Sequence, residues 1–267
     1  MIKHGHDNIN NKNTINHRNL FISVILNFGI TIVEVIGGII SNSLALVSDA
    51  LHNLGDTTAL IIAYFAHLIS RREYTYKRTF GYKRIEILAA LFNAIVLIVI
   101  VVYLFIEAFK RFKHPEPIKG MIMLGVALTG LLANFISAYL LKKDSKKNLN
   151  IKAAYLHIFG DTVSSFVVII SSILIYFYNI YWIDPLVTIF LGLYLLKETY
   201  AILRQSVDIL MQGTPRGLDL NIIKAELESL PEISNIHHVH AWNLTDSEIH
   251  FECHVDLKED LRISDTE

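Results

Sequence analysis

The chain has 267 residues, of which 52% are hydrophobic and 18% are charged, and its formal net charge at pH 7 is −1. This apolar balance is more typical of membrane proteins than of soluble ones, and the near-neutral charge argues against a nucleic-acid partner. The single cysteine, Cys253, excludes an internal disulfide framework and a thiolate metal cluster within one chain.

Six apolar stretches follow a polar start at residues 1–19, which lacks the hydrophobic core of a signal peptide. Each stretch is long enough for the about 20 residues that a helix needs to cross a bilayer. They cover residues 20–40, 44–70, 85–109, 118–141, 153–178 and 182–203. We therefore predict an all-α polytopic domain of six transmembrane helices within residues 20–205.

Basic residues in the connections predict the orientation, because Lys and Arg concentrate in cytoplasmic loops. Residues 71–84 and 142–152 are rich in Lys and Arg, whereas the connections 41–43 and 179–181 contain neither. One connection, 110–119, is basic on the opposite side. The majority places both termini in the cytoplasm. The frequent Ile, Asn and Lys suggest an AT-rich bacterial genome, and the expected location is the bacterial inner membrane.

The last segment, residues 206–267, predicts a small cytoplasmic α/β domain. An amphipathic helix in "LDLNIIKAELESLP" is followed by two strands, "SNIHHVHAWNLT" and "SEIHFECHVDL", that are joined by a tight turn. A helix over a two-stranded hairpin is marginally stable by itself. The tail is therefore expected either to pair with another chain or to be an incomplete domain.

A histidine and an aspartate stand four residues apart in two of the apolar stretches. "SDALHNLGD" contains His52 and Asp56, and "HIFGD" contains His157 and Asp161. Residues four apart lie on one face of an α-helix, and ionised carboxylates facing lipid are costly, so both faces should turn inward. If the two helices pack together, the four side chains form an N/O ligand set that suits tetrahedral Zn²⁺.

Other interpretations of these polar residues stay open. A His–Asp pair can simply hold helices together by hydrogen bonding, although the repeated spacing favours a ligand set. Asp49, three residues before His52, is either a partner of a ligating histidine or part of an aqueous vestibule. Glu34 in the first span is a possible proton or ion relay.

Histidine and aspartate also release a metal when they are protonated, since metal ligands must be deprotonated to bind. Metal/proton antiport is therefore a natural mechanism for this ligand set. The ion would be a transported substrate, and no resident cofactor is expected.

Nearly the whole chain resembles the cation diffusion facilitator family, in particular its zinc–cobalt–cadmium efflux branch. The resemblance is carried by "NFGITIVEVIGGIISNSLALVSDALHNLGD", "FGYKRIEILAALFNAIVL", "AAYLHIFGDTVSS", "DILMQGTPRGLDL" and "VHAWNLT". It implies a homodimer in the lipid membrane that exports divalent cations in exchange for protons by alternating access. The family's transport ligands fall on His52, Asp56, His157 and Asp161. Two histidines favour zinc, with cobalt and cadmium as further substrates.

The resemblance also implies a metallochaperone-like cytoplasmic tail that dimerises and often binds additional zinc. Its histidine positions match His237, His240 and His254, which are alternatively polar strand-face residues at a dimer surface. His238 stands where the family often has an acidic residue. The family's tail would continue by one helix and one strand, so the domain is expected to be incomplete, with an uncovered edge strand.

Two further function classes compete with a transporter. An intramembrane zinc-dependent hydrolase would use the same four residues, but a catalytic zinc normally has three protein ligands and an open position. A membrane metal sensor would need an output domain, and none is visible in the sequence. A transporter and not an enzyme is therefore expected, with Cd²⁺ or Co²⁺ as alternatives to Zn²⁺ as its main substrate.

Overall fold

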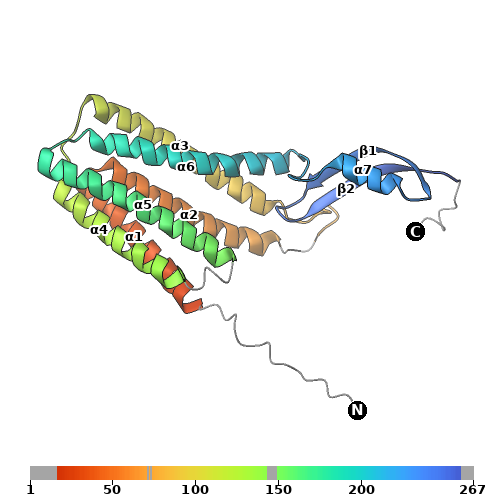
Figure 1. The fold of residues 1–267 in the computed structure, drawn as a ribbon, viewed down its shortest axis with the longest axis horizontal. Helices are drawn as coiled ribbons and strands as arrows, with labels where there is room; N and C mark the ends of the chain where they lie inside the picture. Colours follow the sequence, from red (N-terminus) through yellow and green to blue (C-terminus); the bar gives the residue numbers. More distant parts are fainter. Residues whose placement is uncertain (1–16, 71, 73, 143–148, 260–267) are drawn as a thin grey trace, which may run out of the picture. The chain divides into compact units, whose positions relative to one another are not determined.

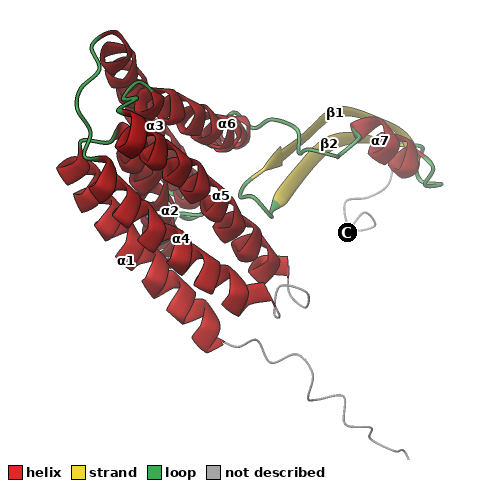
Figure 2. Cartoon of the chain, turned by 60° about the vertical axis from the view of Figure 1, so that its left-hand side comes forward, coloured by secondary structure: helices red, strands yellow, loops and turns green. Residues whose placement is uncertain are grey.

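The computed structural model describes residues 17–70, 72, 74–142 and 149–259. Six long helices precede a short helix and a two-stranded hairpin (Figure 1). The elements are α1 His17–Ser41, α2 Leu44–Ser70, α3 Ile85–Lys113, α4 Gly120–Lys142, α5 Leu149–Tyr178, α6 Ile183–Leu210, α7 Leu220–Glu228, β1 Ile233–Asn243 and β2 Ile249–Leu257. The predicted mainly helical fold with a small C-terminal sheet is confirmed (Figure 2).

Parts of the predicted organisation lie outside the described residues. These are most of the polar start (residues 1–16), the middle of the lysine-rich connection (143–148), two residues of the arginine-rich loop (71 and 73) and the last residues (260–267). Residues 1–16 of the polar segment and residues 260–267 of the tail therefore lie outside the structural description.

Two helices extend well past the C-terminal ends of their predicted apolar stretches. α3 continues to Lys113, and its last turn holds Lys110, Arg111 and Lys113, whose charges favour the negative end of the helix dipole. α6 continues to Leu210 through Arg204 and Gln205, residue types with good helix propensity. The apolar stretch ends before the helix does, because helix formation does not require apolar residues.

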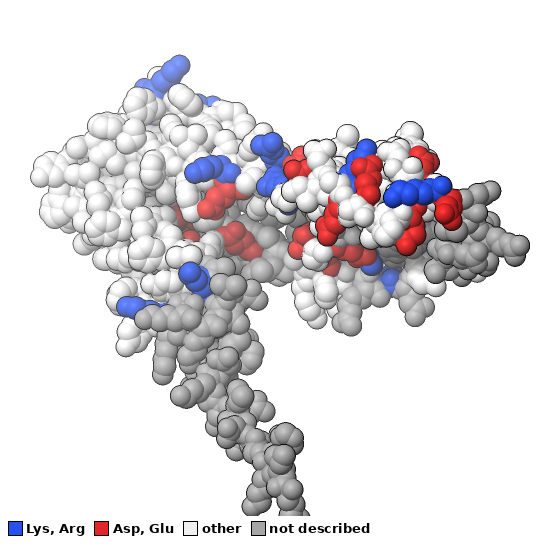
Figure 3. All heavy atoms as spheres, turned by 45° about the vertical axis from the view of Figure 1, so that its right-hand side comes forward, with Lys and Arg blue, Asp and Glu red and all other residues white. Residues whose placement is uncertain are grey.

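Five segments are long and apolar enough to cross a membrane by length and composition. They are Ile22–Ser41, Ile85–Lys113, Gly120–Lys142, Ala154–Tyr178 and Ile183–Leu210. α2 is not among them. Lys, Arg, Asp and Glu gather over the C-terminal α/β part, whereas the visible face of the helices consists mainly of other residue types (Figure 3). The five segments and this surface fit an integral membrane protein.

The chain divides into two compact units, one of residues 1–57 with 98–197 and one of 58–97 with 198–267. In the first unit, α4 packs against α1 and α5. The buried side of α4 is a stripe of mostly small residues at helical spacing: Gly120, Met123, Ala127, Gly130, Asn134, Ser137 and Leu141. Small residues allow helices in a membrane to approach closely, and α4 packs against both α1 and α5.

The beginning of α2 is fixed by a buried carboxylate from α6. Asp184 is fully buried and accepts hydrogen bonds from the Ser43 hydroxyl and from the backbone N–H groups of Leu44, at 2.7 Å, and Ala45. The first N–H groups of a helix have no partner within the helix, so Asp184 satisfies them. These hydrogen bonds hold the start of the helix that carries His52.

In the second unit, β1 and β2 pair antiparallel, and α7 packs against β1. The ladder is irregular between His237 and His240, where His238 has a positive φ of 53°. The buried apolar residues of this hairpin region are Ile236, Ala241 and Leu244. On β2, Ile249, Phe251, Val255 and Leu257 stand at alternate positions of one strand and are exposed.

Candidate metal centre

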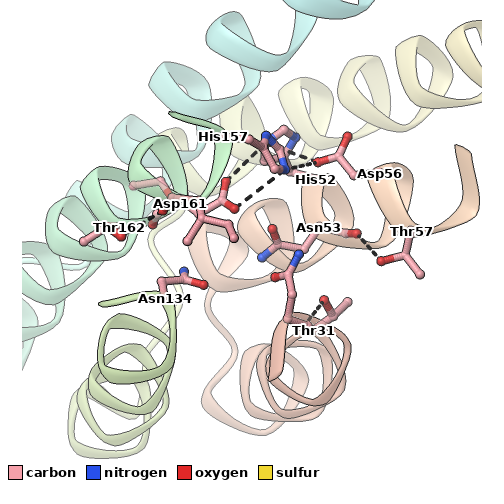
Figure 4. Close-up of polar contacts among 12 residues, drawn as sticks. Thr31, His52, Asn53, Asp56, Thr57, Asn134, His157, Asp161 and Thr162 are labelled. Atoms are coloured by element: carbon pink, nitrogen blue, oxygen red, sulfur yellow. Dashed lines mark hydrogen bonds and ion pairs between the residues drawn. The ribbon is translucent and has the colours of Figure 1, made fainter. Parts of the chain in front are cut away.

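The two predicted His–Asp pairs meet between α2 and α5 (Figure 4). His52 Nε2 lies 3.7 Å from Asp56 Oδ2 on its own helix and 3.7 Å from Asp161 Oδ1 on α5. His157 Nε2 lies 3.1 Å from Asp56 Oδ2 and 3.7 Å from Asp161 Oδ2. Each histidine therefore contacts the carboxylates of both helices.

These separations match those of ligands around a single small cation. With zinc–ligand bonds near 2.0–2.2 Å, the ligand atoms of a tetrahedron lie about 3.3 Å apart. Ligand atoms of His52, His157 and Asp161 lie within 4.8 Å of one another, and Asp56 joins them through its contact with His157. The four residues supply two imidazoles and two carboxylates, which would balance a double positive charge.

The site is closed on one side and open on the other. The side chains of His52 and Asp161 are 12% and 4% exposed, whereas those of Asp56 and His157 are 37% and 38% exposed. Asp56 and His157 therefore lie nearer the surface of the helices than His52 and Asp161 do.

A small cavity of about 20 Å³ adjoins the buried pair and is also lined by Asp49, Ser164 and Tyr194. The Ser164 hydroxyl donates to Asp49 Oδ1 at 2.7 Å, and Asp49 is 4% exposed. The cavity has room for about one water molecule. Tyr194 of α6 meets the His52 ring edge-on at 6.4 Å; a tyrosine in an apolar helix carries no signal that could have predicted this contact.

Glu34 lies in a second buried polar group in this unit, and it is 1% exposed. The amide of Asn53, the residue after His52, donates to Glu34 Oε2 at 3.1 Å. A Cβ on Gly130 would lie 2.7 Å from Glu34 Oε1, so a larger residue there would require the Glu34 carboxyl group to shift. Sequence reasoning missed Asn53, although its place beside His52 on α2 was available as a signal.

The structure differs from the sequence prediction for the cytoplasmic histidines. Ligand atoms of His237, His238 and His254 lie within 4.8 Å of one another, and their ring centroids are 5.0 to 5.4 Å apart. His240 is not in this group and stands opposite Glu252 in the ladder. The irregularity at His238 breaks the strand alternation, so that adjacent histidines come together.

Comparison with known protein families gives this geometry its context. A family model for the transmembrane domain of cation efflux proteins matches residues 20–211. A second model, for the cytoplasmic domain of cation efflux proteins, matches residues 215–267. This chain belongs to the cation efflux family. The resemblance inferred from the motifs is confirmed, and the chain is an integral membrane protein of a transporter family.

Curated relatives of the cation efflux family cover most of the chain. The cadmium, cobalt and zinc/H⁺–K⁺ antiporter of Bacillus subtilis (strain 168) is 38% identical over 260 residues, 97% of this chain and 84% of the relative. The metal cation efflux protein CzcD of Cupriavidus metallidurans is 39% identical over 240 residues, 90% of this chain and 76% of CzcD. The zinc transporter ZitB of Escherichia coli (strain K12) is 40% identical over 241 residues, 90% of this chain and 77% of ZitB.

Proposed function

We propose that this protein exports Zn²⁺ from the cytoplasm in exchange for protons by alternating access. The observation that carries the proposal is the convergence of His52, Asp56, His157 and Asp161 from two helices at distances suited to one ion. In this proposal, residues 20–205 form six membrane-spanning helices, α2 included. Residues 206–267 form the cytoplasmic domain, and both termini lie in the cytoplasm of a bacterial inner membrane.

The ligand types support both the ion and its exchange. Two imidazoles and two carboxylates suit Zn²⁺, and two negative charges offset the cation where the surroundings have a low dielectric constant. Protons compete with the metal for the same nitrogen and oxygen atoms. Acidification on one side would therefore release the ion there, and loss of protons on the cytoplasmic side would restore the site.

The named substrates of the relatives support the same assignment. The Bacillus subtilis relative is named as an antiporter of cadmium, cobalt and zinc with H⁺ and K⁺, and the Escherichia coli relative as a zinc transporter. We extend these to the present chain as zinc first, with cadmium and cobalt as further substrates. An intramembrane hydrolase loses support because both matching family models describe cation efflux proteins.

Two buried carboxyl groups have supporting roles in this proposal. Asp49, held by Ser164, orients His52 and Asp161 beside the small cavity that it shares with them. Asp49→Asn should weaken zinc binding while Asp49→Glu restores part of it; equal binding by wild type and Asp49→Asn would remove this role. Glu34 is proposed as a proton relay, because its carboxyl group is buried and hydrogen-bonded to the neighbour of a ligand.

The cytoplasmic hairpin supports two further parts of the proposal. His237, His238 and His254 form a second zinc site with three imidazoles. The exposed apolar residues of β2 form part of a homodimer surface. Phe251, at the centre of this strand, is 40% exposed. Phe251→Glu should shift the detergent-solubilised protein from dimer to monomer by light scattering, and an unchanged mass would contradict this surface.

The decisive experiment measures zinc flux into proteoliposomes with and without an imposed pH gradient. Wild type should move zinc into vesicles with an acidic interior as protons leave them. His157→Ala should lose this movement while still inserting into the membrane. His240→Ala is the matched control, because His240 stands apart from both histidine groups. Zinc binding without gradient-driven flux would overturn the transporter proposal and return the hydrolase interpretation.

A further inference from the structure

A cavity of about 270 Å³ lies within the second unit, between the loop before α3 and the hairpin. Arg78 and Arg84 contribute its positive charge, Phe80, Tyr82 and Trp242 are its aromatic wall residues, and Ile85 and Leu88 extend it along the first turns of α3. None of the residues that line it is acidic. The cavity therefore combines a positive end with an apolar side.

The arginines of this cavity lack anionic partners in the part of the chain that the structure describes. Nε of Arg84 is buried and has no hydrogen-bond partner there, and Arg78 lies over the ring of Tyr82 at 4.4 Å. A buried guanidinium N–H without an acceptor is costly, and a guanidinium binds phosphate oxygens in a bidentate manner. A phosphate-type anion would therefore satisfy these donors.

The walls of the cavity are held together by contacts within the same unit. Lys83 Nζ lies 2.6 Å from Glu248 Oε2. Phe80 meets the His250 ring edge-on at 5.3 Å, and His250 stacks on Trp242 at 5.7 Å between centroids. These contacts hold the loop before α3 against the hairpin. The two walls of the cavity are therefore in place without a ligand.

We propose that this cavity binds the phosphate head group of an anionic phospholipid, with the start of an acyl chain along Ile85 and Leu88. The position favours a lipid over a soluble anion, because Ile85 begins a segment apolar enough to cross the membrane, and head groups lie at the ends of such segments. Basic pockets at the cytoplasmic ends of transmembrane helices are suited to such head groups, and aromatic side chains concentrate at the same level. The site involves none of the His–Asp ligands.

The test uses Trp242 as a reporter. The chain has two tryptophans, so Trp182→Phe leaves Trp242 alone. The delipidated full chain in detergent is titrated with phosphatidylglycerol or phosphatidylcholine that carries a nitroxide quencher near the head-group end of one acyl chain. Phosphatidylglycerol should quench Trp242 at a clearly lower concentration than phosphatidylcholine. Quenching at equal concentrations of the two lipids would overturn the proposal.

Variants locate the site. Arg84→Gln in the Trp182→Phe background should raise the phosphatidylglycerol concentration for half-quenching roughly fivefold, as expected for one lost basic contact, and should leave phosphatidylcholine unchanged. Lys77→Gln, in the same loop but outside the cavity lining, is the matched control and should behave as the parent. Arg78→Gln, at an exposed position, provides the same test if Arg84→Gln elutes as an aggregate. An unchanged preference in both arginine variants would overturn the proposal.

A competition arm distinguishes the lipid from a free anion. Millimolar inorganic phosphate is added to the phosphatidylglycerol-quenched protein, with the same concentration of sodium sulfate as an ionic-strength control. Persistent quenching supports a lipid site that needs the acyl chain as well as the head group. Full recovery of Trp242 fluorescence with phosphate but not with sulfate would replace the lipid by a soluble phosphate ligand and contradict the proposal.

Discussion

The protein holds two groups of histidines that are candidate metal sites, and the surroundings of the two groups differ. In the helical unit, His52 and His157 are joined by two aspartates, and Asp161 is 4% exposed. In the hairpin, His237, His238 and His254 gather with one carboxylate at their edge, since Asp256 Oδ2 lies 3.4 Å from His237 Nδ1, and the side chain of His237 is 39% exposed. The larger number of carboxylates in the helical unit fits its surroundings, because a dication in a low-dielectric site needs negative ligands, whereas water stabilises one at the surface.

The comparison predicts that the membrane site fails completely when one negative charge is removed. Asp161→Asn and Asp56→Asn, which keep side-chain size, should each lower zinc flux in proteoliposomes by roughly 100-fold or more, as expected when a charge partner is lost from a buried cluster. Asp246→Asn, at an exposed turn, should keep full flux. Substantial flux in either site variant at equal protein content would show that the site needs only one carboxylate.

The histidines of the membrane site should determine which ion is preferred. His52→Asp replaces a nitrogen ligand by oxygen and should shift the ratio of zinc to cadmium flux by about tenfold toward cadmium, since ligand type and geometry decide selectivity more than raw affinity. The two fluxes are measured in the same vesicle preparation. A ratio equal to that of wild type would mean that His52 does not set selectivity.

The Glu34→Gln variant tests whether a buried carboxylate in the helical unit can serve transport without binding the metal. Glu34→Gln keeps the shape and the contact with Asn53, so equilibrium zinc binding should change less than about twofold, while pH-gradient-driven flux should fall about tenfold, a typical effect of a supporting residue. Isothermal titration and flux assays are compared. Parallel loss of binding and flux would make Glu34 part of the metal site and not a relay.

The hairpin histidines should matter less for transport. His238→Ala should lower the zinc-to-protein ratio at saturation by one per chain and change flux by less than about twofold, because exposed ligands contribute less than buried charged ones. His240→Ala serves as the control, since its ring lies outside the group. If the control loses zinc and the His238 variant does not, the ligand set of the hairpin must be reassigned.

The smallest effect is expected at the ion pair that ties the loop to the hairpin. The hydrogen bond from Lys83 holds the pKa of Glu248 below its usual value, with the nearby charge of Lys83 acting in the same direction. A carboxyl group with a lowered pKa stabilises the folded state when the pH is above the usual pKa of glutamate. This stabilisation is lost as the pH falls through the lowered pKa.

Lys83→Gln should therefore cost under about 1 kcal/mol, because both side chains are partly exposed. The difference in thermal stability between wild type and this variant should be present at pH 7 and should close below about pH 4. A difference that stays constant across this range would mean that packing, and not the ion pair, is affected by the substitution.

The sequence predicted the long helices and the four-residue His–Asp spacing because both are local patterns. Apolar runs define where helices form, and the helical period brings His52 toward Asp56 without any tertiary information. The places where prediction failed depend on the backbone or on distant contacts. The bulge that places the side chain of His238 next to that of His237 has no sequence signal. The contacts of Asn53 and Tyr194 depend on which helices become neighbours.

The hydrogen bonds from the start of α2 to Asp184 are another contact between distant residues that the sequence did not predict. An aspartate near a helix start predicts a cap for its own helix, yet this one caps α2 from α6. Local reasoning therefore identified the candidate ligands but not the residues that hold them in place.

The division of the four ligands between α2 and α5 has a mechanical consequence. Each helix contributes one imidazole and one carboxylate, so a bound ion would act as a removable crosslink between two separate rods. The start of one rod is fixed by Asp184, which leaves rotation or bending further along α2 as the movement that such a crosslink can restrain. Binding of an ion would then change the spacing of the two helices, and paired spin labels on α2 and α5 can follow this spacing in real time.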